Sequence, residues 1–244
     1  MLGILSKTVL FPYYMALKVR HFLYDKNIKK STSWPVPVIC VGNITVGGTG
    51  KTPHTEMLIR LLGEKYNIAV LSRGYKRESK GFRIARITDS FKEVGDEPLQ
   101  IKQKFPNLTV AVCKSRREGI EKLLALPEGK KGGLEDGTRP QVIILDDGFQ
   151  HRKVKPSHSI VLVNYNKPIF GDNLLPIGSL RDLPGQIKRA NSVVISKSPV
   201  AIYLDGIMDQ ERTAEAVKQE EAMFLCRKNL VPAAFFVGLG SGLL

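Results

Sequence analysis

Cysteine is scarce in this sequence of 244 residues. The three cysteines, Cys40, Cys113 and Cys226, are widely spaced and odd in number, so they match neither a disulfide framework nor a metal-binding pattern. Cys40 and Cys113 lie within apolar runs, so we expect them to be reduced core residues, which is typical of a cytosolic protein.

Acidic residues are also in short supply. The chain has 23 Asp and Glu against 37 Lys and Arg, a formal net charge of +14. This excess favours polyanionic partners, namely nucleotides, phosphorylated substrates, nucleic acids or anionic membranes. No recognised nucleic-acid-binding module is present, so a nucleic-acid-binding ATPase is supported by charge alone, and we expect no nucleic acid partner.

A long apolar run is missing from the first 30 residues. The longest charge-free run there, residues 8–17, contains Pro12 and is shorter than the roughly 20 residues needed to span a membrane. No small-residue cleavage site follows, which argues against a signal peptide. Apolar residues recur at helical spacing, and basic residues gather toward Lys30. Two interpretations stay open: an amphipathic helix on an anionic membrane surface, or a helix packed on the core.

The most informative stretch is residues 36–53. A β-branched apolar run predicts a buried strand, a glycine-rich turn follows, and Pro53 suits a first helical turn. Such a turn binds the phosphates of ATP through its backbone N–H groups, here those of Gly47, Gly48, Thr49 and Gly50. Lys51 would reach the β- and γ-phosphates, and the Thr52 hydroxyl would bind Mg²⁺. Thr45 replaces the first glycine of the strict pattern, so the loop is a variant.

A second strong signal lies at residues 142–148. Four apolar residues predict a buried strand that delivers Asp146 and Asp147 to the carboxyl edge of a parallel sheet. There Asp146 would hold Mg²⁺, and Asp147 would be a second ligand or a base. The alternation of strands and helices predicts an α/β fold, a P-loop NTPase-type mostly parallel sheet flanked by helices, preceded by an N-terminal amphipathic helix.

Three weaker signals each have a purely structural interpretation as well. Residues 73–77 follow a predicted strand and form either a ligand-binding edge or a solvated basic loop. Asp96 and Glu97 can simply cap the helix that continues to Lys104. His151 is either functional or structural. Residues 128–139 are expected to form a flexible surface loop.

Together these segments resemble the tetraacyldisaccharide 4'-kinase family of lipid A biosynthesis in Gram-negative bacteria. The similar motifs, in the family's order, lie at residues 41–53, 72–75, 95–98, 146–151 and 175–181. The resemblance implies transfer of the γ-phosphate of ATP, with Mg²⁺, to the 4'-hydroxyl of tetraacyldisaccharide 1-phosphate, which forms lipid IVA. It also implies the cytoplasmic face of the bacterial inner membrane, because a tetraacylated substrate stays in the bilayer.

The resemblance also implies roles for individual residues. Lys51 and Thr52 hold phosphates and metal, Asp146 and Asp147 organise Mg²⁺, and Asp96 is the base that takes the proton of the sugar hydroxyl. The catalytic set is therefore Asp96, Lys51 and Asp147. The residues implied in substrate binding are Arg73, Tyr75, Glu97, Gln150, His151 and Arg181. No protein partner is evident.

Two departures from the family pattern stand out. Asp182 replaces the usual glutamate, a small change in reach. The likeness is expected to cover residues 1–198, and the family's later lobe supplies a histidine, whereas all four histidines here precede that region. We thus expect a membrane-associating helix (1–30), a P-loop kinase core (31–198) and a divergent or truncated C-terminal segment (199–244) that impairs catalysis.

The alternative is a membrane-associated, partner-regulated P-loop ATPase. Proteins of that class have a signature lysine directly before the paired glycines, and Val46 at that position counts against it.

Overall fold

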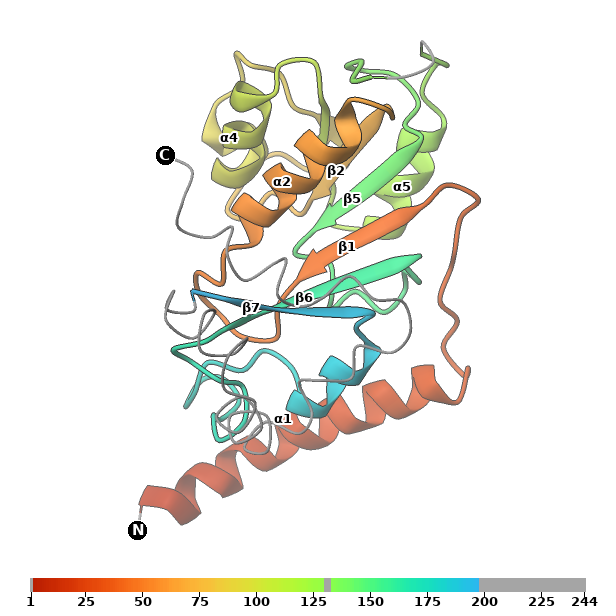
Figure 1. Ribbon diagram of the computed structural model, residues 1–244. Coiled ribbons are helices and arrows are strands. Elements are labelled where there is room, and N and C mark those ends of the chain that lie inside the picture. Colours follow the sequence, from red (N-terminus) through yellow and green to blue (C-terminus); the bar gives the residue numbers. More distant parts are fainter. Residues whose placement is uncertain (1, 130–132, 198–244) are drawn as a thin grey trace, which may run out of the picture. The chain divides into compact units, whose positions relative to one another are not determined.

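The computed structural model describes residues 2–129 and 133–197 (Figure 1). The chain forms two compact units. The first, called here the sheet unit, comprises Ser31–Gly42 and Lys51–His158. The second, called the loop unit, comprises the N-terminal residues to Lys30, Asn43–Gly50 and the residues from Ser159 onward.

Five strands form the sheet of the sheet unit. They are β1 (Val38–Gly42), β2 (Ile68–Ser72), β3 (Arg83–Ile84), β4 (Thr109–Val112) and β5 (Val142–Asp146). Their order is β3-β4-β2-β5-β1, with parallel pairing except for the antiparallel edge strand β3. Every residue of β2, β4 and β5 is buried, as expected for parallel strands covered on both faces.

Four helices belong to this unit. They are α2 (Lys51–Gly63), α3 (Phe91–Val94), α4 (Asp96–Lys104) and α5 (Arg116–Leu124). Helix α2 contacts β1 and β5, α4 contacts β4, and α5 contacts β2. Ser115 caps α5, because its side chain accepts a hydrogen bond from the Glu118 N–H. The expected α/β class with a mostly parallel sheet and flanking helices is thus confirmed.

The described part of residues 128–139 is tied to the sheet unit more firmly than expected. The Glu135 N–H donates to the Asn67 side chain at 3.0 Å, and the Gly137 N–H donates to Thr109 Oγ1 at 2.9 Å. Asp136 forms an ion pair of 2.6 Å with the buried Lys102 amine. These bonds anchor residues 135–137 to the sheet unit, so this surface loop has more fixed contacts than its sequence indicated.

The loop unit contains α1 (Leu2–Asp25), β6 (His158–Asn164), the 3₁₀-helix η1 (Pro184–Arg189) and β7 (Ser192–Ser196). β6 and β7 pair in parallel. No helix within the described residues is long and apolar enough to span a membrane.

Helix α1 has two different faces. Leu17, His21 and Tyr24 are buried, whereas Phe11 and Phe22 are 60% and 55% exposed. The buried face agrees with a helix packed in the loop unit, and docking of the exposed apolar face on a membrane stays a prediction.

Candidate active site

Within the loop unit, the first residues of the phosphate loop are hydrogen-bonded to residues 179–181. The Val46 N–H donates to Ser179 O at 2.7 Å, and the Arg181 N–H donates to Ile44 O at 2.8 Å. Gly47 and Gly50 have φ angles of 101° and 84°, a region that favours glycine. The expected glycine-rich turn is therefore present, and the residues before its glycines pair with residues 179–181.

Two side chains hold Thr49 in place within this loop, one through its hydroxyl and one through its carbonyl. The Asn43 amide donates to Thr49 Oγ1 at 2.8 Å, and the Ser196 hydroxyl donates to Thr49 O at 2.8 Å. The Arg181 guanidinium in turn donates to the Asn43 side chain. Of the expected site residues, Arg181 and residues 47–50 thus lie together in the loop unit.

The sheet unit brings Lys51 to the acidic pair. Lys51 begins α2, and its amine lies 3.8 Å from Asp147 Oδ1. The register explains this contact, because Val41 of β1 lies opposite Asp146 of β5, so both strands end at one edge. A Cβ on Gly42 would lie 2.6 Å from Phe149 Cβ, so only glycine lets the acidic turn pack this closely on β1.

Asp146 is the most unusual group in the sheet unit. Its side chain is buried, and neither carboxylate oxygen has a hydrogen-bond partner in the described part of the chain. Its pKa is raised to about 7, mainly by burial and to a lesser extent by Glu97 and Asp147, while Lys51 and Arg116 oppose the rise. A buried carboxylate in this state is suited to a hard cation such as Mg²⁺.

The donor set fits Mg²⁺ bound together with a nucleotide. Within the described ranges, no group of three or more His, Cys, Asp or Glu side chains could hold a metal by itself. Phosphate-loop sites do not require one, since phosphates and water supply most of the ligands and the protein adds a hydroxyl and a carboxylate. Thr52 in the first turn of α2 and Asp146 are residues of these types.

Arg116 is a site residue that the sequence reading missed. It is buried, donating to Cys113 O at 2.8 Å and to Asp146 O at 3.1 Å. Burial lowers its pKa to about 10, so the guanidinium stays charged at neutral pH. The signal was available: an arginine directly after a helix cap that itself follows a strand end.

Two glycines bring the Arg73–Tyr75 segment against the turn before α4. Gly74 and Gly95 have φ angles of 68° and 92°, and a Cβ on Gly95 would lie 3.1 Å from the Gly74 Cα. Asp96 and Glu97 are exposed in the first turn of α4. Because Glu97 acts on the pKa of Asp146, this turn belongs to the same electrostatic site.

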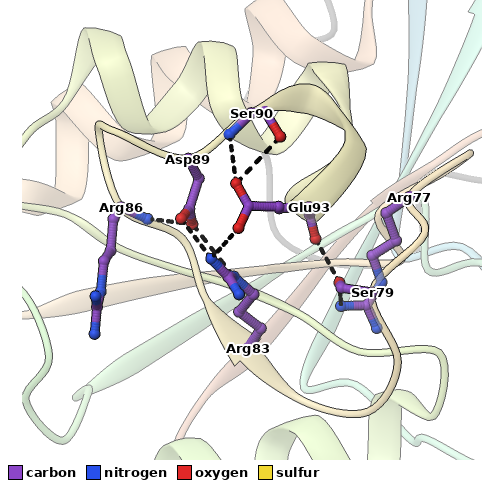
Figure 2. A network of polar contacts seen from close by, with 7 residues as sticks. All are labelled: Arg77, Ser79, Arg83, Arg86, Asp89, Ser90 and Glu93. Carbon is purple, nitrogen blue, oxygen red and sulfur yellow. Dashed lines mark hydrogen bonds and ion pairs between the residues drawn. The ribbon is translucent and has the colours of Figure 1, made fainter.

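A polar network formed by residues 77–93 lies next to the turn before α4 (Figure 2). The Arg83 guanidinium pairs with Asp89 at 2.5 Å and with Glu93 at 2.8 Å. The Ser79 hydroxyl donates to Glu93 O, and Glu93 accepts from the Ser90 N–H at 2.9 Å. The network ties β3 and the segment after Tyr75 to α3, which ends directly before Gly95.

The remaining expected residues fall as follows. Arg73 is exposed and Tyr75 is 72% exposed, both beside the turn before α4. Gln150 and His151 are half-buried just after the acidic pair, and the His151 N–H donates to Gly148 O at 2.9 Å. Asp182 is fully buried and pairs with His21 of α1 at 2.6 Å.

A parallel strand leading into a glycine-rich loop and a helix that begins with Lys-Thr, with an acidic pair after the neighbouring strand, defines a phosphate-loop nucleotide-binding protein. Comparison with known proteins narrows this class. A sequence model described as tetraacyldisaccharide-1-P 4'-kinase matches residues 4–237, so the chain belongs to that family. The match continues past residue 198, further than the likeness was expected to reach; residues 198–244 lie outside the described part.

Named relatives agree with this assignment. The chain is 49% identical over 202 residues to the tetraacyldisaccharide 4'-kinase of Flavobacterium psychrophilum, covering 81% of this chain and 56% of that one. It is 50% identical over 187 residues to the enzyme of that name from Porphyromonas gingivalis, covering 77% and 50%. The chain therefore spans about half the length of the curated relatives it matches.

A solved structure is similar as well. It is LpxK from Aquifex aeolicus, described as an "apo" form in complex with ATP. The TM-score is 0.67 and the identity 37%, over 78% of this chain and 58% of that one.

Proposed function

We propose that the chain binds ATP with Mg²⁺ and transfers the γ-phosphate to the 4'-hydroxyl of tetraacyldisaccharide 1-phosphate. The observation that supports this most directly is the buried Asp146 carboxylate, whose oxygens have no partner in the described part of the chain, beside the Lys51–Asp147 pair. An ionised carboxylate that is buried costs free energy unless a cation binds it, and MgATP supplies that cation. The family and the names of its members supply the acceptor.

In this proposal each site residue has a defined task. Lys51 binds the β- and γ-phosphates, and its pairing with Asp147 holds the amine at the start of α2 before nucleotide arrives. Thr52 and Asp146 would hold Mg²⁺, which neutralises charge on the transferring phosphate when it is bound. Arg116 keeps its charge under Asp146 and so limits the cost of ionising that carboxylate.

Asp96 is proposed as the base. Its exposed carboxylate accepts the proton of the 4'-hydroxyl while the hydroxyl oxygen attacks the γ-phosphorus. The new oxygen–phosphorus bond forms as the bond to the β–γ bridging oxygen breaks, and ADP leaves. The proposed sugar and phosphate contacts are those that the family resemblance implies, namely Arg73, Tyr75, Glu97, Gln150, His151 and Arg181.

The acceptor also requires access to a membrane. Each buried acyl CH₂ contributes about 0.8 kcal/mol, so a tetraacylated lipid does not leave the bilayer on its own. The exposed face of α1, with Phe11 and Phe22, is the proposed docking surface on the cytoplasmic side of the inner membrane.

A kinase assay tests the proposal. The chain is incubated with ATP, MgCl₂ and tetraacyldisaccharide 1-phosphate in detergent, and 4'-phosphorylated product is measured beside ATP binding. Asp96→Asn is the matched control, because it should bind ATP like the wild type and form little product. Intact ATP binding without product in the wild type would remove the kinase activity, whereas absent ATP binding would remove the nucleotide site itself.

A further inference from the structure

Lys197 occupies an unexpected position at the end of β7, in the loop unit. Its amine lies 3.9 Å from the position that a Cβ on Gly48 would take, so it stands over the backbone of the phosphate loop. Gly48 is exposed and has no side chain to cover that backbone. Neither the kinase resemblance nor the proposed mechanism uses this lysine.

The backbone next to Lys197 is held in place by hydrogen bonds of Ser196. Ser196 is buried and donates to Thr49 O at 2.8 Å, which ties the end of β7 directly to the loop. The Tyr165 N–H donates to Ser196 O at 2.9 Å from the other side. The position of Lys197 relative to Gly48 is therefore set by the strand end and not by a long flexible segment.

The backbone of Lys197 is itself unusual. Its φ angle is 61°, in the left-handed region that non-glycine residues rarely adopt. Asp147, the first residue after β5, has the same conformation with φ 53°. In both cases the residue directly after a strand turns sharply, and strained residues of this kind gather at functional sites.

Electrostatics indicates what the amine faces. In the described part of the chain the Lys197 amine forms no ion pair, and the neighbouring loop presents N–H groups that are themselves electropositive. A cation at such a place is repelled unless an anion lies between the amine and the loop. The anion that a phosphate loop binds is the phosphate of a nucleotide.

We propose that the Lys197 amine binds a phosphate of the nucleotide held by residues 47–50, as a cation additional to Lys51. This inference rests on the proposed function, because it requires a nucleotide in the loop. Val46 stands where partner-regulated ATPases have their signature lysine, and in this proposal Lys197, directly after β7, supplies a second cation to the loop.

The test uses variants of the full chain that change the charge of the Lys197 side chain separately from its length. Lys197→Met removes the charge and keeps the length of the side chain, whereas Lys197→Arg keeps the charge. Lys188→Met is the control, since Lys188 is an exposed lysine of η1 in the same unit. Dissociation constants for ATP and ADP are measured with Mg²⁺, and thermal melting without nucleotide checks the fold of each variant.

We expect Lys197→Met to weaken ATP binding about ten-fold or more, as for loss of one charge-assisted hydrogen bond. Lys197→Arg should bind close to the wild type, and Lys188→Met should be unchanged. A loss for ATP alone would place the amine on the γ-phosphate, and a loss for both nucleotides would place it on the β-phosphate. Lys197→Met binding within two-fold of wild type, or equal weakening by Met and Arg, would overturn the inference. Failure of the wild type to bind ATP would instead overturn the proposed function and this inference with it.

Discussion

The Asp146 carboxyl should make the nucleotide-free protein less stable as pH rises toward neutrality. Burial raises the pKa of this group to about 7 from an ordinary value of 3.8. Between these two values the folded protein keeps a proton that the unfolded chain has lost. The stability of the folded state is therefore fully present below the unfolded pKa and is lost as pH rises through the folded pKa.

The size of the effect follows from the two pKa values. A tenfold change in proton affinity is worth about 1.4 kcal/mol. The difference between 3.8 and about 7 thus corresponds to about 4 kcal/mol of lost stability at high pH. Of this loss, roughly 2.5 kcal/mol falls between pH 5 and pH 8.

Asp146→Asn is the perturbation that tests this reasoning, because the amide has nearly the same shape and does not titrate. Urea unfolding of wild type and variant without nucleotide should show the variant gaining roughly 2.5 kcal/mol over the wild type from pH 5 to pH 8. Saturating MgATP should stabilise the wild type far more than the variant at pH 8, since the bound cation favours the ionised carboxylate.

Asp172→Asn is the matched control. Burial acts to raise the pKa of Asp172, but hydrogen bonds from Ser179 and Asn173 outweigh it and leave that pKa below its ordinary value. Asp172 is therefore ionised in both the folded and unfolded states at pH 5 and at pH 8, so this substitution should cost the same at both. Parallel pH profiles for wild type and Asp146→Asn would refute the reasoning.

Three further predictions concern the loop, the glycine contact and the exposed helix face. Lys51→Ala should lower ATP affinity at least about ten-fold in a binding titration, because it removes a charged phosphate contact; unchanged affinity would contradict the loop assignment. Gly95→Ala should lower unfolding stability by about 1–3 kcal/mol in urea and reduce kinase turnover, because its φ is 92° and its Cβ would crowd a neighbouring backbone at 3.1 Å. Phe11→Ser with Phe22→Ser should reduce binding to anionic vesicles about ten-fold, from the loss of two half-exposed apolar side chains. In the same flotation assay Leu61→Ser, which removes an exposed leucine of α2, should change nothing.

The parts of this protein that were predictable from sequence are those encoded locally. The strand, glycine turn and helix start at residues 36–53 follow one another directly, and so do the apolar run and acidic pair at residues 142–147. Each pattern determines its own secondary structure, and parallel pairing then places the carboxyl ends of both strands at the same edge of the sheet. That is why the contact between Lys51 and Asp147 could be expected before any coordinates.

What could not be predicted depends on contacts between distant segments. In helix α2, Ile59 is buried, whereas Leu61 is 62% exposed. Several apolar residues at neighbouring positions define more than one possible face, and packing on β1 and β5 selects between them. Arg116 and Lys197 were missed for the same reason, because their partners are 30 and about 150 residues away.

Helix α1 shows why its two interpretations could not be separated from sequence. The buried His21 pairs with Asp182, and the hydroxyl of Tyr13, which is 38% exposed, donates to Arg181 O at 3.3 Å. Arg181 itself bonds to Asn43, whose amide holds Thr49 of the phosphate loop. A continuous series of hydrogen bonds thus runs within the loop unit from the helix that exposes Phe22 to the nucleotide loop. Core packing requires one apolar face of α1, and the proposed docking on a membrane requires another, so its sequence pattern supports both interpretations at once.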